Sequence, residues 1–222
     1  TNMIAHELRA PLTAIRGYAS MIEETEGIRD EEKKYAIRVK DSSNRLLAIV
    51  SDLLDVARIH SGKLKVETEN ADVSNIIVAV CEELDPSALE KHITLTHTGT
   101  DTSHLASFDP KRMHQALTNL VSNAIKYTKQ GSIELAIEEK FNAIELRVKD
   151  TGMGISASDQ KQLFAPFFRV ESDDVSQITG TGLGMWITRQ LIELMGATIS
   201  VESIKGVGTH VVVSIPKNTS KK

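Results

Sequence analysis

The stretch Ile178-Thr-Gly-Thr-Gly-Leu-Gly-Met-Trp186 places three glycines directly before a segment with the periodicity of a helix. Glycine lets the backbone come close to phosphate oxygens, and the N–H groups that begin a helix attract anions. A second glycine pair lies upstream in Asp150-Thr-Gly-Met-Gly154, and two asparagines, Asn119 and Asn123, lie upstream again. One glycine cluster alone is weak evidence. The three features together predict a nucleotide pocket.

Composition limits the class of protein. The 222 residues, 41% hydrophobic and 25% charged, suit one globular domain with a small second one. A net charge of -4 without a basic, aromatic-rich block argues against nucleic-acid binding. The single Cys81 excludes an intrachain disulfide and a cysteine-based zinc cluster, and it fits a reducing compartment. No apolar run approaches the roughly 20 residues of a membrane span. We expect a cytoplasmic location, with any membrane contact made through segments outside this sequence.

Residues 1–62 have the pattern of a helical hairpin. Gly27 supplies the break between the helices, and Asp30 is predicted to cap the second one. In the second helix the apolar positions alternate steps of three and four residues, as in a coiled-coil seam: Ala36, Val39, Ser43, Leu46, Val50, Leu53 and Ala57. So long a seam leaves apolar surface uncovered in a lone hairpin. We therefore expect a homodimer in which two hairpins form a four-helix bundle.

His6 is the candidate nucleophile of the first helix. At about 100° per residue, it lies nearly opposite the apolar stripe that contains Leu8 and Ile15. Glu7 is close enough to bond the imidazole Nδ1, which would leave Nε2 as the nucleophilic nitrogen. The alternatives are a histidine satisfied within the core and a plain solvated histidine.

From about residue 63 the pattern changes to mixed helix and strand. Ile144, Leu146 and Val148 alternate as a strand with one buried face, and Asp150 continues that face with a carboxylate. Asp109 and Pro110 form an N-cap followed by a proline at the first helical position. The pattern predicts strands over 93–96, 132–137, 144–150, 198–202 and 210–215, and helices over 73–84, 110–127 and 184–195.

The predicted helix 110–127 carries a polar ridge of Asn119, Asn123 and Lys126, spaced by four and three residues. Two amides and an ammonium on one ridge suit a metal-bound polyphosphate, because an asparagine carbonyl can bind Mg²⁺ whose other ligands are water and phosphate oxygens. The alternative is a solvated polar flank of an ordinary helix.

These residues, taken together, resemble a known family. The chain looks like the catalytic half of a sensor histidine kinase of a two-component system, with an α+β fold. Residues 1–62 would be the dimerisation and histidine-phosphotransfer hairpin, and 63–218 an α/β sandwich ATP-binding domain of the Bergerat type, followed by a tail, 219–222. The five motifs appear in order as the H-box His6-Glu-Leu-Arg-Ala-Pro-Leu12, the N-box Asn119-Leu-Val-Ser-Asn-Ala-Ile-Lys-Tyr127, the G1 box Asp150–Gly154, the F-box Phe164-Ala-Pro-Phe-Phe-Arg169 and the G2 box Gly180-Thr-Gly-Leu-Gly184.

The resemblance assigns roles around bound ATP. Asp150 would accept a hydrogen bond from the adenine amino group, and Asn123 would bind Mg²⁺. Lys126 and Arg169 would neutralise phosphate charge. Residues 169–180, with acidic Glu171, Asp173 and Asp174, would form a mobile lid. The other nucleotide-binding positions that the resemblance implies are Asn119, Tyr127, Gly152, Gly154, Gly180, Thr181, Gly182, Leu183 and Gly184.

The resemblance also implies a reaction. His6, with Glu7 as its partner, would take the γ-phosphoryl group of ATP and pass it to an aspartate of a response-regulator receiver domain, after a movement about a linker near residues 61–63. Ala10 departs from the Thr or Asn usual four residues after the histidine, and a methyl group cannot orient water, so we expect weak phosphatase activity toward the regulator. The alternatives are a non-catalytic ATP-binding dimeric scaffold, and an ATP-driven clamp or serine kinase, which would lack the H-box hairpin.

Overall fold

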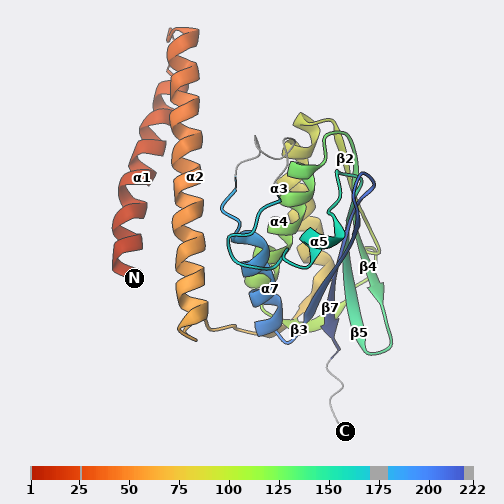
Figure 1. Ribbon diagram of the computed structural model, residues 1–222. Coiled ribbons are helices and arrows are strands. Elements are labelled where there is room, and N and C mark those ends of the chain that lie inside the picture. Colours follow the sequence, from red (N-terminus) through yellow and green to blue (C-terminus); the bar gives the residue numbers. More distant parts are fainter. Residues whose placement is uncertain (1, 26, 171–179, 218–222) are drawn as a thin grey trace. The chain divides into compact units, whose positions relative to one another are not determined.

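The computed structural model (Figure 1) describes residues 2–25, 27–170 and 180–217, apart from the side chains of residues 2–11. The chain divides into two compact units, Thr1–Lys65 and Val66–Lys222. Within the described ranges, no helix is both long and apolar enough to cross a membrane.

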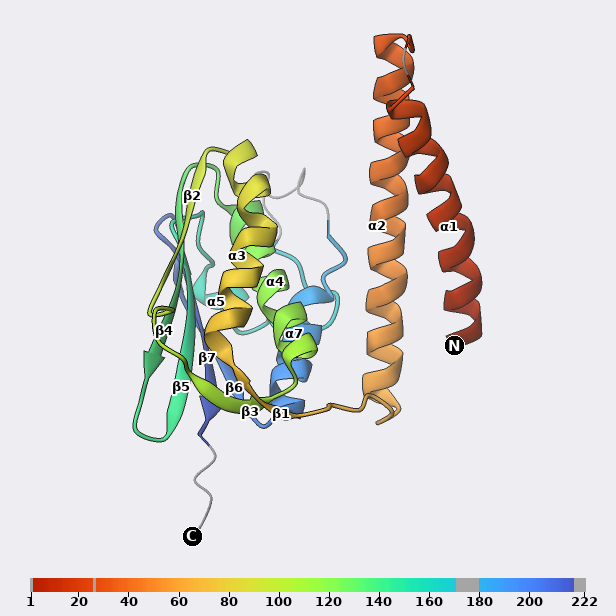
Figure 2. The same ribbon diagram turned by 180° about the vertical axis from the view of Figure 1, so that it is seen from behind.

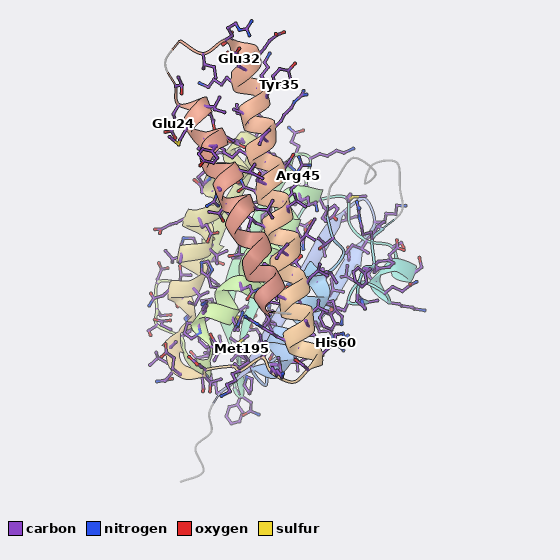
Figure 3. The ribbon with its side chains drawn as sticks, turned by 90° about the vertical axis from the view of Figure 1, so that its left-hand side faces the viewer. Glu24, Glu32, Tyr35, Arg45, His60 and Met195 are labelled. Carbon is purple, nitrogen blue, oxygen red and sulfur yellow. The ribbon has the colours of Figure 1, made fainter. Side chains whose placement is uncertain are left out.

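The first unit is the predicted helical hairpin. It consists of α1 (Asn2–Glu23) and α2 (Asp30–His60), and Gly27 makes the turn at a φ of 79°. Figure 3 shows Glu24 and Glu32 at the loop end of the hairpin and His60 at the far end of α2. The prediction that Asp30 caps α2 is wrong by one residue, because Arg29 holds the cap position. The Arg29 side chain binds Glu32, so Asp30 instead lies in the first turn, where the helix dipole favours a carboxylate.

The residues of the coiled-coil seam of α2 differ in how far they are buried. Ala36 and Ser43, seven residues apart, are buried in the hairpin. Val39, Leu46 and Leu53, also spaced by seven, remain 45–48% exposed. Part of the seam thus packs within the hairpin, while the row of Val39, Leu46 and Leu53 stays about half exposed.

The second unit is a mixed sheet covered by helices. Its five strands have the order β2-β4-β5-β7-β6, with β2 parallel to β4 and the other pairs antiparallel. Figure 1 and Figure 2 show α3, α4 and α7 on one face of this sheet. The strands are β2 (Ile93–Thr98), β4 (Gly131–Glu139), β5 (Ala143–Asp150), β6 (Thr198–Ile204) and β7 (Gly208–Pro216). The helices are α3 (Val73–Glu90), α4 (Pro110–Tyr127), the short α5 (Ala157–Gln160) and α7 (Gly184–Leu194). A separate antiparallel pair consists of β1 (Glu69–Asp72) and β3 (Leu105–Phe108).

The core lies between the sheet and the helices. Every second residue of the three central strands is buried there: Ile133, Leu135 and Ile137 of β4, Ile144, Leu146 and Val148 of β5, and Val211, Val213 and Ile215 of β7. Asp150 has the same parity and pairs with Ile133 on one side and Thr209 on the other. The sheet therefore brings a single carboxylate to the end of an otherwise apolar face.

The predicted elements are all present, with differences at their ends. Helix α4 has the predicted bounds, and Asp109 caps it by accepting a hydrogen bond from the Arg112 amide at 3.0 Å. Helix α3 continues to Glu90, six residues beyond its predicted end, with Pro86 inside it. The short elements β1, β3 and α5 were not predicted.

Candidate functional site

The polar ridge of α4 packs against α7. The Asn119 side chain donates from Nδ2 to Thr188 Oγ1 at 2.7 Å, and Asn123 Nδ2 lies 3.5 Å from Met185 Sδ. Both partners lie on α7. Because the amide nitrogen of each asparagine points to α7, the amide oxygen is the group that remains for a ligand.

The glycine-rich segment before α7 lies against the same ridge. A Cβ added to Gly180 would come within 2.8 Å of Lys126 Nζ, and one added to Gly184 within 2.6 Å of Asn119 Oδ1. Gly182 has a φ of 72°, and a Cβ there would lie 2.7 Å from the backbone carbon of Phe167. Gly182 combines a positive φ with backbone contacts that leave no room for a Cβ, so this position needs glycine. At Gly180 and Gly184 a Cβ would instead displace the side chains of Lys126 and Asn119. The fold thus brings together two motifs that are about sixty residues apart.

The remaining positions of this segment are also ordered by local contacts. Thr181 Oγ1 accepts a hydrogen bond from the Leu183 amide at 3.2 Å, which tightens the turn into α7. Leu183 is buried, with only 1% of its surface exposed. The segment is therefore a packed turn at the start of a helix, whose amide groups can face an anion.

Three cations gather at the C-terminal end of α4. Lys126 is half-buried, and its Nζ lies 5.5 Å from the centroid of the Tyr127 ring. Burial lowers the pKa of Lys126, and the positive charges of Arg169 and Lys91 lower it further. Lys91 Nζ donates to the backbone oxygens of Ile125 at 2.8 Å and Lys126 at 3.2 Å. A bound anion would relieve this mutual repulsion.

Asp150 is held in a fixed orientation at the end of β5. Its Oδ1 accepts hydrogen bonds from the backbone amides of Gly152 at 2.8 Å and Thr209 at 3.2 Å. Burial raises the pKa of Asp150, although these two hydrogen bonds act in the opposite direction. A carboxylate with one oxygen bound to the backbone presents its second oxygen as an acceptor of known direction.

The loop after Asp150 is tied to α4 and to the β6–β7 turn. The Met153 amide donates to the Tyr127 oxygen at 3.2 Å, and the Gly206 amide donates to the Met153 oxygen at 2.7 Å. A Cβ on Gly152 would meet that same Tyr127 oxygen at 2.7 Å. Gly154 has a φ of 62°, and a Cβ there would lie 2.0 Å from the oxygen of Ile204. The C-terminal end of α4 therefore adjoins both glycine clusters.

The other predicted site residues are placed less completely. His6 and Glu7 lie in α1, which belongs to the other unit, and their side chains, like that of Ala10, fall outside the part of the chain that is described. Arg169 is exposed and acts on Lys126 through its charge. The acidic residues of the predicted lid, Glu171, Asp173 and Asp174, also lie outside the described residues.

Four residues that lie at this site were not predicted from the sequence: Lys91, Thr128, Thr188 and Thr209. Thr128 directly follows the N-box, and Thr209 follows a glycine pair, so proximity to a motif was a usable signal for both. Thr188 and Lys91 had no such signal, because their contacts with α4 arise only from tertiary packing.

Comparison with known proteins matches both units. Residues 1–62 match the His Kinase A (phospho-acceptor) domain, and residues 108–219 match the histidine kinase-, DNA gyrase B- and HSP90-like ATPase family. The chain is 34% identical, over 98% of its length, to an uncharacterized sensor-like histidine kinase of Rhizobium meliloti, and covers 42% of that protein. It is 35% identical over 96% of its length to the sensor histidine kinase RcsC of Escherichia coli, covering 22% of it. It is 30% identical over 96% of its length to the autoinducer 2 sensor kinase/phosphatase LuxQ of Vibrio cholerae, covering 25% of it.

Solved structures agree with these relatives. Full-length ShkA in complex with AMPPNP superposes with a TM-score of 0.80 at 27% identity, over 97% of this chain and 45% of that one. The histidine kinase ThkA in complex with the response regulator protein TrrA gives a TM-score of 0.67 at 25% identity, over all of this chain and 62% of that one. The chain spans less than half of the length of the three curated relatives. With its phospho-acceptor hairpin and its ATPase domain in this order, the chain belongs to the sensor histidine kinases of two-component systems.

Proposed function

We propose that this chain transfers the γ-phosphoryl group of ATP to His6 and then to an aspartate of a response-regulator receiver domain. The observation that carries the proposal is the contact between the Asn119–Lys126 ridge and the 180–184 glycine segment, at a place where Lys126 is half-buried and its pKa is lowered by burial and by nearby positive charge. A polyphosphate is the ligand that such a site suits. The family match and the AMPPNP complex of ShkA support ATP as that ligand.

The nucleotide would bind with its two ends at different parts of the site. Asp150 accepts from the adenine amino group, and Tyr127 and Leu183 line the pocket. Lys126 and Arg169 neutralise the phosphates. The amide oxygen of Asn123 fits a Mg²⁺ ligand, because its Nδ2 already contacts Met185 and magnesium completes its shell with phosphate oxygens and water. Bound Mg²⁺ would offset charge on the transferring group.

The chemical step is an in-line displacement at phosphorus. The lone pair of His6 Nε2 forms a bond to the γ-phosphorus, the bond from that phosphorus to the bridging β–γ oxygen breaks, and ADP leaves with the electron pair. Glu7 accepts a hydrogen bond from Nδ1–H and so stabilises the positive charge that develops on the ring. Phosphohistidine and ADP are the products.

The active form would be a homodimer. Val39, Leu46 and Leu53 form an apolar row along α2 that stays about half exposed in the lone hairpin. A second copy with the same row would cover it and complete a four-helix bundle. The His Kinase A match to residues 1–62 supports this assembly.

The partner would be a receiver domain that offers an aspartate. The complex of ThkA with TrrA supports a regulator as the partner. Since Ala10 has no hydroxyl or amide to orient a hydrolytic water, removal of phosphate from the regulator would be weak.

The test is phosphorylation with γ-labelled ATP and Mg²⁺, comparing the wild-type chain with His6→Gln. The matched control is His97→Gln, which alters an exposed histidine of β2. We expect acid-labile, base-stable label in the wild type and in the control, and none in His6→Gln. Equal labelling of all three would contradict the proposal. Nucleotide binding without any labelling would instead favour a non-catalytic ATP-binding scaffold.

A further inference from the structure

Thr188 carries a buried hydroxyl on α7 that bonds a side chain of the candidate site. It is 1% exposed and lies one turn after Gly184, the first residue of α7. Its Oγ1 accepts a hydrogen bond from Asn119 Nδ2 at 2.7 Å. A buried polar group is costly unless it has a partner, and the other buried residues of this helix are all apolar: Ile187, Leu191 and Ile192. The contact with Asn119 therefore accounts for a hydroxyl at this position.

The amide of Asn119 lies between Thr188 and the start of α7. A Cβ on Gly184 would lie 2.6 Å from Asn119 Oδ1 and 3.1 Å from its Nδ2, so the oxygen is the end nearer to Gly184. The NH₂ group and the oxygen of an asparagine have nearly the same shape, and only their partners decide which way the amide faces. Because Thr188 binds the nitrogen, it keeps the oxygen on the side of Gly184.

The orientation of this amide matters because its two ends bind opposite charges. An amide oxygen can bind a cation, whereas the NH₂ group can only donate, as to a phosphate. Leu183, the N-cap of α7, makes no side-chain cap, so the first amide groups of α7 remain available to an anion. With Asn119 Oδ1 beside these donors, the site suits a phosphate together with its cation. An NH₂ group in place of this oxygen would suit the phosphate alone.

We infer that Thr188 is a positioning residue, which holds the Asn119 oxygen toward a Mg²⁺ ion bound with the nucleotide. The second amide of the ridge is held less firmly, because Asn123 Nδ2 has the thioether of Met185, a weak acceptor, at 3.5 Å. The inference rests on the proposed binding of ATP with Mg²⁺, and it adds a residue outside the five motifs.

The test measures how much Mg²⁺ strengthens the binding of ADP. Titration calorimetry on the 222-residue chain gives the dissociation constant of ADP with saturating Mg²⁺ and with the metal removed by EDTA. The ratio of the two constants is the Mg²⁺ enhancement. Thr188→Val removes the hydroxyl at nearly constant volume, and Thr188→Ser keeps it. Thr118→Val is the matched control, because the Thr118 hydroxyl lies by His114 instead.

One hydrogen bond between neutral groups corresponds to about a fivefold change in an equilibrium constant. We expect the Mg²⁺ enhancement to fall by about that factor in Thr188→Val. The affinity for ADP without metal should stay equal or rise, since a reversed amide presents its NH₂ group to the phosphates. Thr188→Ser and Thr118→Val should keep the enhancement of the wild type. A purely structural role of Thr188 would instead weaken ADP binding equally with and without Mg²⁺.

Asn119→Asp separates the orientation of the amide from the packing of α7. A carboxylate has two oxygens, so reversing it exchanges one acceptor for another. In a chain that already carries Asn119→Asp, the further change Thr188→Val should therefore leave the Mg²⁺ enhancement unaltered. A structural role of Thr188 would persist in this background.

Three outcomes overturn the inference. The first is a Mg²⁺ enhancement in Thr188→Val equal to that of the wild type, whether or not ADP binding weakens. The second is a loss of enhancement that persists in the Asn119→Asp background. The third is a wild-type chain that binds ADP equally with and without Mg²⁺, a comparison that needs no variant to fold. A wild-type chain that does not bind ADP in either condition contradicts the proposed function itself and is thereby told apart from failure of the role of Thr188.

Discussion

Replacing Asp150 by asparagine keeps the shape of the side chain and exchanges one oxygen for an NH₂ group. Oδ1 already accepts from the amides of Gly152 and Thr209, so the asparagine oxygen will take that position. The NH₂ group must then occupy the place of Oδ2 and face the adenine amino group, donor against donor. The variant loses a charge-assisted hydrogen bond, about 1.5–3 kcal/mol, and leaves donors unpaired at a further cost of about 1–3 kcal/mol. The two costs together are about 2.5–6 kcal/mol, so nucleotide binding should weaken by a factor of about sixty or more.

The same change should leave the fold intact. Burial raises the pKa of Asp150 above that of a free carboxyl. A raised pKa in the folded state means that folding stability is greatest below the unfolded pKa and declines as pH rises through the folded value. At neutral pH, Asp150→Asn removes this unfavourable charge and keeps both backbone contacts, so the melting temperature without nucleotide should stay equal or rise.

Calorimetric titration with ADP and Mg²⁺, together with thermal melts, measures both quantities, and Asp101→Asn at an exposed position serves as control. An affinity within threefold of the wild type would refute the assigned orientation of Asp150. A large fall in the melting temperature would show that the carboxylate serves the fold rather than the ligand.

Three further predictions concern other parts of the chain. Gly184→Ala places a Cβ 2.6 Å from Asn119 Oδ1, so it should weaken ADP binding, measured by calorimetry, about tenfold or more. Gly17→Ala is the control, because a Cβ there meets no atom within 4 Å and should leave ADP binding unchanged. Ala10→Thr should raise the rate at which the phosphorylated regulator loses its label, and an unchanged rate would count against the proposed effect of Ala10. Burial would raise the pKa of Asp72, but the hydrogen bonds that its carboxylate accepts lower it from 3.8 to about 2. A lowered pKa in the folded state stabilises the fold above the unfolded pKa, and this stabilisation is lost as pH falls through the folded pKa. In urea unfolding, the wild type should therefore be more stable than Asp72→Asn at neutral pH, and the difference should shrink as pH falls from 3.8 to about 2.

Local signals were sufficient for most of the fold. Asp109 and Pro110 together begin α4 at its predicted residue, because a side-chain cap and a fixed φ act within one turn of the chain. The alternation of β5 located Asp150 on the inner face, since parity along a strand depends only on residue count. The predicted helix 73–84 is too short, because α3 continues to Glu90 with Pro86 inside it.

What the sequence did not reveal depends on distant contacts. The strands β1 and β3 are four residues each and pair across more than thirty positions, so neither carries a periodic pattern of its own. The hydroxyl of Thr128 becomes conspicuous only when folding buries it beside Gly152. In both cases the decisive neighbour comes from a remote part of the chain.

Lys91 binds the C-terminal end of α4, close to the residues proposed to hold the nucleotide phosphates. A helix carries a partial negative charge at its C-terminal end, where carbonyl groups lack partners, and α4 ends beside the residues proposed to hold the nucleotide. The ammonium group of Lys91 binds two of those carbonyls and so masks the negative pole of the helix next to a polyanionic ligand. We therefore expect Lys91, which lies more than two dozen positions before the N-box, to contribute to nucleotide affinity. A comparison of relatives confined to motif residues would miss this contribution.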